Sequence, residues 1–374
     1  MKILVISSPF LPVTNGYGKC LLECCIAMKE RGCELYYLSP YPCLISDEIK
    51  DFFSLTFQYK QSSFNRFHPL KIIHRIEHIF CKYDRVDNLY PWGMENYVNK
   101  LNSKYSFDAC IINYITLSRL FKKCKIPRRI IFTHDTFTYK NEILSVPQFW
   151  FMLKPSEEAK GIRRGTDVLA VQQDEKTLFQ YYHPKGKHYT IFCRMPINSQ
   201  SLTFNNNVLF LAGNNKLNLN GIIFFLNYVL PLVQAKTSVT ILIGGSICKE
   251  LNQYANNPSI KLLGPIDDIN EFYANGDIAI NPIYQGTGLK IKTMEALSYG
   301  KVTIVHNHSI KGIYKSESAP LMVANTAEEY SDLVVKALDD YQLRKELSLR
   351  SLSYIKEMNN YVDKEYSLLL GDEQ

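Results

Sequence analysis

The sequence predicts an α/β protein with two Rossmann-like domains, each built on a parallel sheet. The chain has 374 residues, a length that suits two domains of about 150 residues each. Short apolar runs alternate with amphipathic runs of helical spacing, as they do in βαβ units. The alternation stops in a polar stretch, Pro196–Asn207, and then starts again. We interpret this stretch as the linker between the domains.

The first half opens as a βαβ unit, in which the loop Pro9–Gly18 separates a strand from a helix. We expect the helix to end at Gly32, because glycine commonly stops helices. Residues 40–95 are less regular and look like an insertion. The predicted strands of this half are Lys2–Ser7, Glu34–Ser39, Asp108–Asn113, Arg129–Thr133, Asp167–Val171 and His188–Phe192, and its helices are Lys19–Arg31 and Glu157–Arg164.

The second half repeats this rhythm and ends in a helix over Tyr341–Leu370. We therefore expect an N-terminal domain over residues 1–200, a C-terminal domain over residues 201–350, and a C-terminal helix over residues 351–374 that packs back on the first domain. The predicted strands of the second half are Val208–Ala212, Val239–Ile243, Asp277–Asn281 and Val302–Val305, and its other helices are Gly221–Val233, Asp267–Ala274 and Leu289–Tyr299.

The net charge is +7, and the basic residues gather in two groups of the first half. Such a surface attracts nucleic acid, anionic lipid or phosphorylated substrates, and a solvated face is the alternative. We expect no nucleic-acid partner, and we keep peripheral membrane contact as an open expectation. The groups are Lys60, Arg66, His68, Lys71, His74, Arg75, His78, Lys82 and Arg85, and then Lys122, Lys123, Lys125, Arg128 and Arg129.

Cysteine usage and the N-terminus indicate the compartment. Ten cysteines without CxxC pairs or zinc spacing indicate buried free thiols in a reducing environment. The start MKILVISS lacks the cationic and apolar regions of a signal peptide. The most apolar stretch, Gly221–Ala235, is too short to span a membrane. We expect a cytoplasmic location, with the inner face of a membrane as one place of action.

The segment Val146–Leu153 is short, aromatic and close to basic residues. This composition favours a segment that lies on a membrane or lines an acceptor groove. A buried loop or helix is the alternative.

Two glycine-containing loops follow predicted strands of the second half, and ligands of parallel sheets bind beyond the carboxyl ends of the strands. One loop is Ala212–Asn215 and the other is Tyr284–Gly288. The second is the stronger candidate. Its glycines let the backbone approach a ligand closely, and the helix that follows offers a positive dipole end to phosphate.

Lys290 and Glu295 extend this candidate site along the helix. A cation in the first turn is unfavourable for the helix unless an anion binds there. Glu295 lies on the face of Gly288, about 10 Å along the axis, where its carboxylate could accept both hydroxyls of a ribose. The alternative is a surface helix after a glycine turn, with Glu295 solvated or paired with Lys292.

The run GTGLKIKTMEALSYGKVTIV, residues 286–305, resembles the donor-site signature of retaining glycosyltransferases of family 4. That signature has a Gly-x-Gly turn, a basic residue, a Glu followed by Ala, and a Gly before a strand. The order over Ile260–Asp277 is similar to the family's approach to this motif. Asn15–Gly18 looks like its acceptor-side glycine loop, and Arg163–Glu175 resembles the end of its first domain. The resemblance is thin over residues 40–100.

The resemblance implies the GT-B fold, in which two Rossmann-like domains face each other across a cleft and the C-terminal helix crosses back to the first domain. It also implies a UDP- or GDP-sugar donor, with Glu295 on the ribose and Lys290 on the diphosphate. His134 matches a histidine that faces the cleft in many relatives, and a structural His beside Asp135 as a helix N-cap is the alternative. The residues expected to bind the donor are Gly16, Gly213, Asn214, Lys216, Gly244, Gly286, Thr287, Gly288, Leu289, Lys290 and Glu295, those on the acceptor side are Tyr17 and Asp135, and the catalytic ones are His134, Lys290 and Glu295.

The sequence departs from the family pattern at two positions. Many relatives carry an Arg after the glycine that matches Gly213, where this chain has Asn214, and Lys216 could substitute at a different spacing. The common pattern has a Glu before the first glycine of the turn, where this chain has Gln285. Most of the anion binding would then fall to Lys290 and the helix end.

The implied reaction transfers the sugar with retained anomeric configuration to a glycan or lipid-linked acceptor of cell-surface glycan synthesis. No Asp-x-Asp motif follows a predicted strand, so we expect no essential metal. Two alternatives stay open: a nucleotide-sugar epimerase of the same architecture, and a non-catalytic glycosyltransferase-like partner subunit. A NAD dehydrogenase is less favoured, because the first turn lacks a compact GxGxxG.

Overall fold

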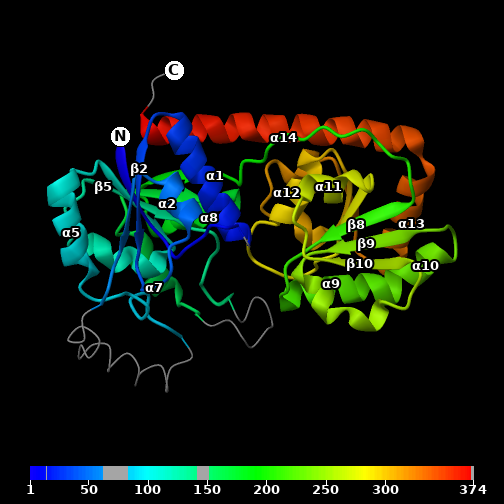
Figure 1. The fold of residues 1–374 in the computed structure, drawn as a ribbon, viewed down its shortest axis with the longest axis horizontal. Coiled ribbons are helices and arrows are strands. Elements are labelled where there is room, and N and C mark those ends of the chain that lie inside the picture. The colour runs from blue at the N-terminus through cyan, green and yellow to red at the C-terminus, as the bar shows by residue number, and fades with distance from the viewer. Residues whose placement is uncertain (14, 62–82, 141–150, 372–374) are drawn as a thin grey trace. The chain divides into compact units, whose positions relative to one another are not determined.

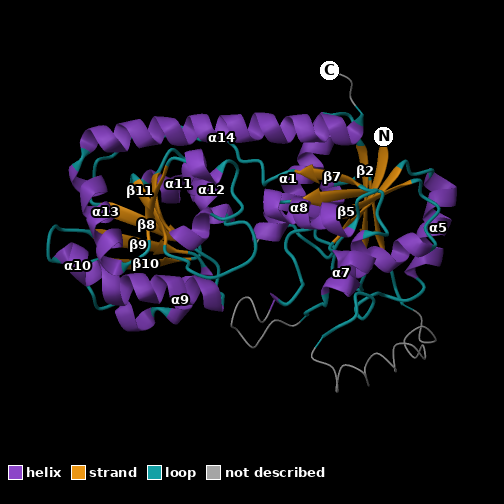
Figure 2. Cartoon of the chain, turned by 180° about the vertical axis from the view of Figure 1, so that it is seen from behind, coloured by secondary structure: helices purple, strands orange, loops and turns teal. Residues whose placement is uncertain are grey.

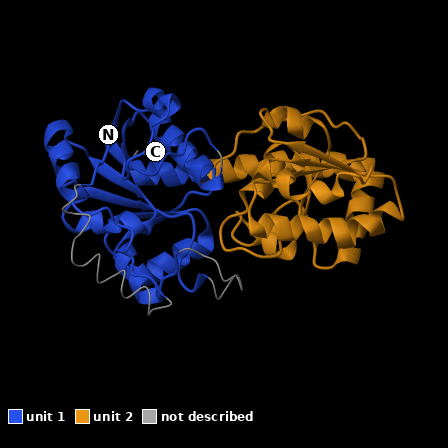
Figure 3. Ribbon diagram, turned by 60° about the horizontal axis from the view of Figure 1, so that its bottom comes forward, with its two compact units in different colours: residues 1–193, 362–374 blue, residues 194–361 orange. Residues whose placement is uncertain are grey.

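The computed structural model describes residues 1–13, 15–61, 83–140 and 151–371. It divides into two compact units, which we call unit 1 (residues 1–193 and 362–374) and unit 2 (residues 194–361) (Figure 3). Unit 1 holds a parallel sheet of seven strands, and unit 2 holds a parallel sheet of six strands. The α/β class with two parallel sheets, predicted from the sequence, is confirmed.

The sheet of unit 1 has the strand order β3-β2-β1-β4-β5-β6-β7. Its central strands are continuous apolar runs, because helices cover both faces of a parallel sheet. The edge strand β3 lies within the stretch predicted as an insertion, so that prediction is wrong for this segment. A short, partly exposed edge strand carries little periodic signal. The strands are β1 Lys2–Ile6, β2 Glu34–Ser39, β3 Leu55–Gln58, β4 Ala109–Asn113, β5 Arg128–Phe132, β6 Asp167–Ala170 and β7 Lys187–Thr190.

The first helix, α1 Gly16–Glu30, begins three residues before its predicted start. Asn15 is its N-cap, and the side-chain oxygen of Asn15 accepts a hydrogen bond from the Gly18 N–H at 2.9 Å. This cap draws the glycines of the loop into the first turn. The other helices of unit 1 are α2 Asp47–Phe52, α5 Met94–Tyr105, η1 Ile115–Lys122, α7 Pro155–Ile162 and α8 Gln173–Tyr182, of which only α7 was predicted.

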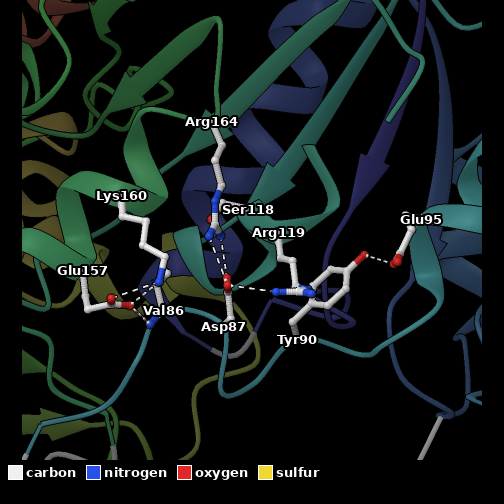
Figure 4. A network of polar contacts seen from close by, with 9 residues as sticks. All are labelled: Val86, Asp87, Tyr90, Glu95, Ser118, Arg119, Glu157, Lys160 and Arg164. Carbon is white, nitrogen blue, oxygen red and sulfur yellow. Dashed lines mark hydrogen bonds and ion pairs between the residues drawn. The ribbon is translucent and has the colours of Figure 1, made fainter. Parts of the chain in front are cut away.

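A polar network anchors the chain before α5 to the rest of unit 1 (Figure 4). Asp87 is buried and accepts hydrogen bonds from two guanidinium groups, those of Arg119 at 3.2 Å and Arg164 at 2.5 Å. The Arg119 guanidinium also lies 3.8 Å from the centroid of the Trp92 ring. Burial works against the charge of Asp87, but the bonds to Arg164 outweigh it and lower the pKa of this carboxyl.

The sheet of unit 2 has the order β10-β9-β8-β11-β12-β13. The helices α9, α10 and α13 cover one face, where they share a core with the strands, and α11 and α12 cover the other (Figure 1). Figure 2 shows the same strands in orange between purple helices. The strands are β8 Asn207–Leu211, β9 Thr240–Gly244, β10 Ile260–Gly264, β11 Ile278–Asn281, β12 Val302–His306 and β13 Leu321–Ala324. The helices are α9 Lys216–Phe224, η2 Phe225–Val229, α10 Leu230–Gln234, η3 Ser246–Glu250, η4 Asn252–Tyr254, α11 Ile269–Ala274, α12 Ile291–Ser298, η5 Asn307–Ile310, η6 Ser316–Ser318 and α13 Ala327–Asp339.

The helical run Lys216–Gln234 is longer than predicted, because the π-helical segment η2 joins α9 to α10 without a break. The run has 19 residues, and the mean hydropathy of an 18-residue window in it is 1.4, which satisfies the length and composition of a membrane span. The stretch predicted over Gly221–Ala235 is thus part of a longer helical run. Its inner residues, among them Ile222, Phe225 and Val229, are buried in the core of unit 2, as the core helix of an α/β domain would be.

The last helix, α14 Tyr341–Leu370, has the predicted bounds. Its first part belongs to unit 2, where Arg344 pairs with Asp277 at 3.3 Å. Its final residues belong to unit 1, where Glu365 accepts a hydrogen bond from the Thr190 N–H at 2.7 Å. The helix therefore belongs to both units.

The described cysteines are all free thiols, and seven of these nine are buried. The pKa of Cys24 is raised to about 12, mainly by burial. Their burial as free thiols agrees with the prediction, and the reducing compartment remains an expectation. Cys81 lies outside the described residues.

Candidate functional site

The candidate site of unit 2 lies at the topological switch point of its sheet, between β8 and β11, where the strand order reverses. From β8 the chain continues to β9 on one side, and β11 pairs with β8 on the other side. Loops that leave such a point diverge and open a crevice at the carboxyl ends of the strands. Both predicted loops start here, one after β8 and the other after β11.

The loop after β11 folds back over itself before it enters α12. Gly286 has φ of 133°, which a side chain would strain. Lys290 is the N-cap residue of α12 rather than a first-turn residue, and its Nζ donates to Gly288 O at 2.8 Å. His308 Nε2 lies 2.7 Å from Gly286 O. The His308 and Lys290 side chains thus hold the loop at Gly286 and Gly288, and the Lys290 ammonium lies beside the N-terminus of α12.

Glu295 is buried in α12 and faces α11. Its Oε1 accepts a hydrogen bond from the Tyr273 hydroxyl at 3.3 Å, and 8% of its surface is exposed. Burial and the Glu295 charge raise the pKa of Tyr273. No ion pair joins Glu295 to Lys292 in the described chain, so the predicted alternative of such a pair does not hold. Tyr273 fixes this carboxylate in one orientation.

The loop after β8 is built from asparagines. The Asn214 N–H donates to Ser246 Oγ at 2.9 Å, and its side-chain amide donates to Glu250 Oε1 at 2.9 Å. A Cβ at Gly213 would meet one atom, Ser246 Oγ at 4.0 Å, whereas a side chain at Gly244 would meet Ile266 and Phe272 closely. Packing alone therefore explains the glycine at 244. Lys216 is the exposed first residue of α9.

Lys292 lies at this site but was not among the residues predicted from the sequence. Its ammonium donates to Asn218 Oδ1 and so joins α12 to α9. Burial, with Lys290 next, lowers the pKa of Lys292 to about 7. Lysines at 290 and 292, at the start of one helix, were the signal available in the sequence.

Unit 1 has a corresponding switch point between β1 and β4. A hydrogen-bonded chain crosses it from Ser7 through Asn113 to His134, at the carboxyl ends of β1, β4 and β5. Ser7 Oγ donates to Ser8 O at 2.8 Å and accepts from Asn113 Nδ2 at 3.0 Å. The amide oxygen of Asn113 is thereby turned toward His134 Nε2, which lies 2.5 Å away.

This chain determines the proton position on His134. Because Asn113 presents an oxygen, Nε2 carries the hydrogen and Nδ1 keeps a free lone pair. Nδ1 is buried and has no hydrogen-bond partner among the described residues. The rings of Phe132 and Tyr114 lie 4.2 and 5.0 Å from the imidazole, and burial lowers the pKa of His134 to about 3. His134 is thus a neutral hydrogen-bond acceptor.

The other predicted residues of unit 1 lie around His134. The Tyr17 ring is 6.1 Å from the imidazole, and Gly16 is the first residue of α1. Asp135 Oδ1 accepts from the Thr136 N–H at 2.9 Å, and Oδ2 accepts from Lys140. In the described chain Asp135 therefore binds Lys140 rather than capping a helix.

Glu175 was seen only as part of the family resemblance, yet its surroundings are unusual. Burial raises its pKa to about 8, and the Asp135 charge adds to the effect. Gln172 Nε2 donates to its Oε1 at 2.8 Å. The carboxyl is therefore protonated at neutral pH. A Glu that follows an apolar strand was the only signal in the sequence.

Several predictions fall on residues that the structure does not describe. They are Thr14 in the glycine loop, the basic residues between 62 and 82, and Phe149 and Trp150 of the aromatic segment. Among residues 1–13, 15–61, 83–140 and 151–371, no group of three His, Cys, Asp or Glu side chains has the arrangement of a metal site.

The chain is similar to a known protein family and to a known protein. Residues 205–340 match the family model of glycosyl transferases group 1. An uncharacterized 44.6 kDa protein in the cps region of Klebsiella pneumoniae is 24% identical over 290 residues, which cover 71% of this chain and 73% of the relative.

Solved structures match the whole fold. The crystal structure of HepE from Anabaena in complex with UDP has a TM-score of 0.71 at 14% identity and covers 100% of both chains. Sucrose-phosphate synthase from Thermosynechococcus elongatus has a TM-score of 0.69 at 12% identity, over 99% of this chain and 98% of that one. Residues 205–340 of unit 2 thus match the family model of glycosyl transferases group 1, and the chain has the GT-B fold.

Proposed function

We propose that this protein transfers a sugar, with retention of anomeric configuration, from a nucleoside-diphosphate sugar to a glycan or lipid-linked acceptor of cell-surface polysaccharide synthesis. UDP is the nucleotide we favour, because the HepE complex contains it. The relative in a cps region supports the polysaccharide role. We also propose that the enzyme works without an essential metal, in the cytoplasm at the inner face of the membrane.

One observation carries the proposal. The loop Gly286–Lys290 opens α12 at the switch point of unit 2, and Glu295 follows on that helix with its carboxylate held by Tyr273. The helix N-terminus and the Lys290 ammonium supply positive charge for the diphosphate. The fixed carboxylate suits a pair of ribose hydroxyls, which can donate to its two oxygens.

The chemistry follows from this charge distribution. The bond between the anomeric carbon and the β-phosphate oxygen breaks, and negative charge grows on the leaving diphosphate. Lys290 and the amide dipoles of α12 stabilise that charge most strongly in the transition state. In a front-face transfer, the leaving phosphate oxygen takes the proton of the acceptor hydroxyl, and that hydroxyl oxygen bonds to the anomeric carbon. At the switch point of unit 1, the lone pair of His134 Nδ1 suits a hydroxyl of a sugar.

Glu295→Gln tests the ribose contact, and Glu271→Gln is the matched control on exposed surface of the same unit. We expect UDP to raise the melting temperature of the wild type and of Glu271→Gln, and to raise that of Glu295→Gln much less, because ligand stabilisation follows affinity. UDP-sugar hydrolysis should fall in parallel.

Three outcomes would contradict the proposal. If UDP raised the melting temperatures of Glu295→Gln and Glu271→Gln equally, Glu295 would not be part of the binding site. An epimerised nucleotide sugar, formed without any acceptor, would favour an epimerase instead. A wild-type protein that binds no nucleoside diphosphate would be a non-catalytic subunit.

A further inference from the structure

Three neighbouring turns of unit 1 carry the excess positive charge of the chain. They lead into β5, β6 and β7 at the amino edge of the sheet, and they span residues 122–129, 163–167 and 183–188. These turns hold nine lysines and arginines and one carboxylate, Asp167, whereas the whole chain has a net charge of +7. The rest of the chain therefore carries no excess of positive charge. The nine cations are Lys122, Lys123, Lys125, Arg128, Arg129, Arg163, Arg164, Lys185 and Lys187.

Hydrogen bonds between the turns hold them side by side. The Thr166 carbonyl oxygen accepts from the Lys187 N–H at 3.0 Å, and the Thr166 N–H donates to the Arg129 carbonyl oxygen at 2.8 Å. Arg163 Nε donates at 2.7 Å to the carbonyl oxygen of Tyr182, the residue directly before the third turn. The three turns thus form one surface, which we call the basic edge.

Few carboxylates neutralise the basic edge. Asp167 pairs with Arg128 at 2.8 Å, and Asp87, from the segment before α5, pairs with Arg164 at 2.5 Å (Figure 4). Within the described chain the other seven cations form no ion pair. Burial, and next the charge of Arg164, lowers the pKa of Lys122. The exposed cations are Lys122, Lys123, Lys125, Arg163, Lys185 and Lys187.

The arrangement fits a lipid bilayer with anionic headgroups. The cations are spread over three turns along one edge of a sheet, and a bilayer presents many headgroups to such a surface at once. The cytoplasmic leaflet of a membrane is anionic and attracts clusters of lysine and arginine. Tyr181, near the end of α8 and just before the third turn, is 80% exposed. An exposed tyrosine beside lysines is typical of side chains that lie at the headgroup level.

We propose that the basic edge of unit 1 binds the anionic headgroups of a lipid bilayer. This inference rests on the proposed function for its place of action, the inner face of a membrane. It assigns the surface that makes the contact and the orientation of unit 1, which the proposed function leaves open.

The orientation has a consequence for the acceptor. His134 follows the carboxyl end of β5, six residues beyond Arg128, which places it about 20 Å from the basic edge. A bilayer at this edge therefore leaves His134 away from the lipid. A lipid-linked acceptor then reaches His134 with the distal end of an oligosaccharide rather than with the sugar next to the lipid.

The first test is flotation of the full chain with vesicles of phosphatidylcholine, alone or with added phosphatidylglycerol. The wild type should float only with the anionic vesicles. Binding should be lost between about 0.1 M and about 1 M salt, where the Debye length falls from about 10 Å to about 3 Å. Each exposed cation strengthens binding to an anionic surface about fivefold, so the loss of three should weaken it about 100-fold.

Two triple variants measure this effect. The basic-edge variant combines Lys123→Gln, Lys125→Gln and Lys185→Gln. The matched control removes the same charge from exposed lysines of unit 2 and combines Lys261→Gln, Lys336→Gln and Lys345→Gln. The control should bind anionic vesicles like the wild type, and the basic-edge variant should bind about 100-fold more weakly.

A lysine footprint tests the orientation. Anionic vesicles should protect the lysines of the basic edge from acetylation, detected by mass spectrometry. Lys60 follows β3 and Lys154 caps the start of α7, so both lie toward the carboxyl edge of the sheet, and both are exposed. These two lysines should stay reactive on the vesicles.

Four outcomes would overturn the inference: no flotation of the wild type with anionic vesicles, equal flotation of the two triple variants, protection of Lys60 and Lys154 in place of the basic edge, or binding of polyglutamate without binding of vesicles. The last would favour an acidic polymer as the partner. Both triple variants should keep the rise in melting temperature that UDP causes. A wild type without that rise would contradict the proposed function, and flotation would still decide the inference.

Discussion

The buried pair of Asp277 and Arg344 gives the strongest prediction about stability. Asp277 is 0% exposed, and its carboxylate accepts hydrogen bonds from the Thr203 N–H at 2.8 Å and the Phe204 N–H at 2.6 Å. Arg344 is 2% exposed and lies 3.3 Å from the same carboxylate. These contacts fasten the chain before β8 and the start of α14 to the sheet of unit 2.

Asp277→Ala leaves a buried guanidinium and two backbone N–H groups without their acceptor. Removing one partner of a buried ion pair costs about 3–5 kcal/mol. For a unit of this size, that cost corresponds to a fall of about 6–20 °C in the melting temperature. Asp332→Ala is the control, because it breaks the exposed pair with Lys236 and should cost about 0–1 kcal/mol.

Urea unfolding followed by circular dichroism measures both variants. The double variant Asp277→Ala with Arg344→Met should be less destabilised than the sum of the single variants, because the orphaned charge is gone. A loss of stability in Asp277→Ala no larger than in Asp332→Ala would refute the reasoning.

Three further predictions concern unit 1. Glu175→Gln should stabilise the protein at pH 8 more than at pH 5. Burial raises the pKa of Glu175 to about 8, so this carboxyl makes the folded protein less stable as the pH rises above the pKa that Glu175 has in the unfolded chain. An equal effect at both pH values in thermal melts would count against this prediction. The His134 imidazole should show the Nε2–H form in ¹⁵N spectra and no titration between pH 5 and pH 8, and its neutral burial should lower stability as pH falls below about 6.5. Asp87→Asn should cost about 3–5 kcal/mol at pH 7. The cost should fall as the pH drops below the ordinary pKa of an aspartate toward the lowered pKa of Asp87, because protonation then removes the charge that the guanidinium groups bind. A destabilisation that does not change with pH, measured by urea unfolding, would contradict this.

The strands and the last helix were predictable because their signals are local. Apolar runs such as Glu34–Ser39 and the long helix Tyr341–Leu370 have the predicted bounds. The start of α1 was missed, because the cap at Asn15 had to be weighed against two glycines that disfavour a helix. The edge strand β3 was missed, because its half-exposed residues lack a clear period.

For the candidate site, the glycine turn and Glu295 were readable from spacing along one helix. The roles of His134 and Lys292 were not, because their partners come from distant strands and helices. Asn113 sets the tautomer of His134 from 21 residues away, and Asn218 lies 74 residues from Lys292. No local pattern records such pairs.

The sequence by itself therefore determined the alternation of strands and helices, the position of the glycine turn and the family resemblance. These depend on periodicity and on residues that are close along the chain. The tertiary structure decided which side chains meet at the two switch points and which of them are protonated. Those properties depend on burial and on distances between elements, and only the packed sheets bring the groups together.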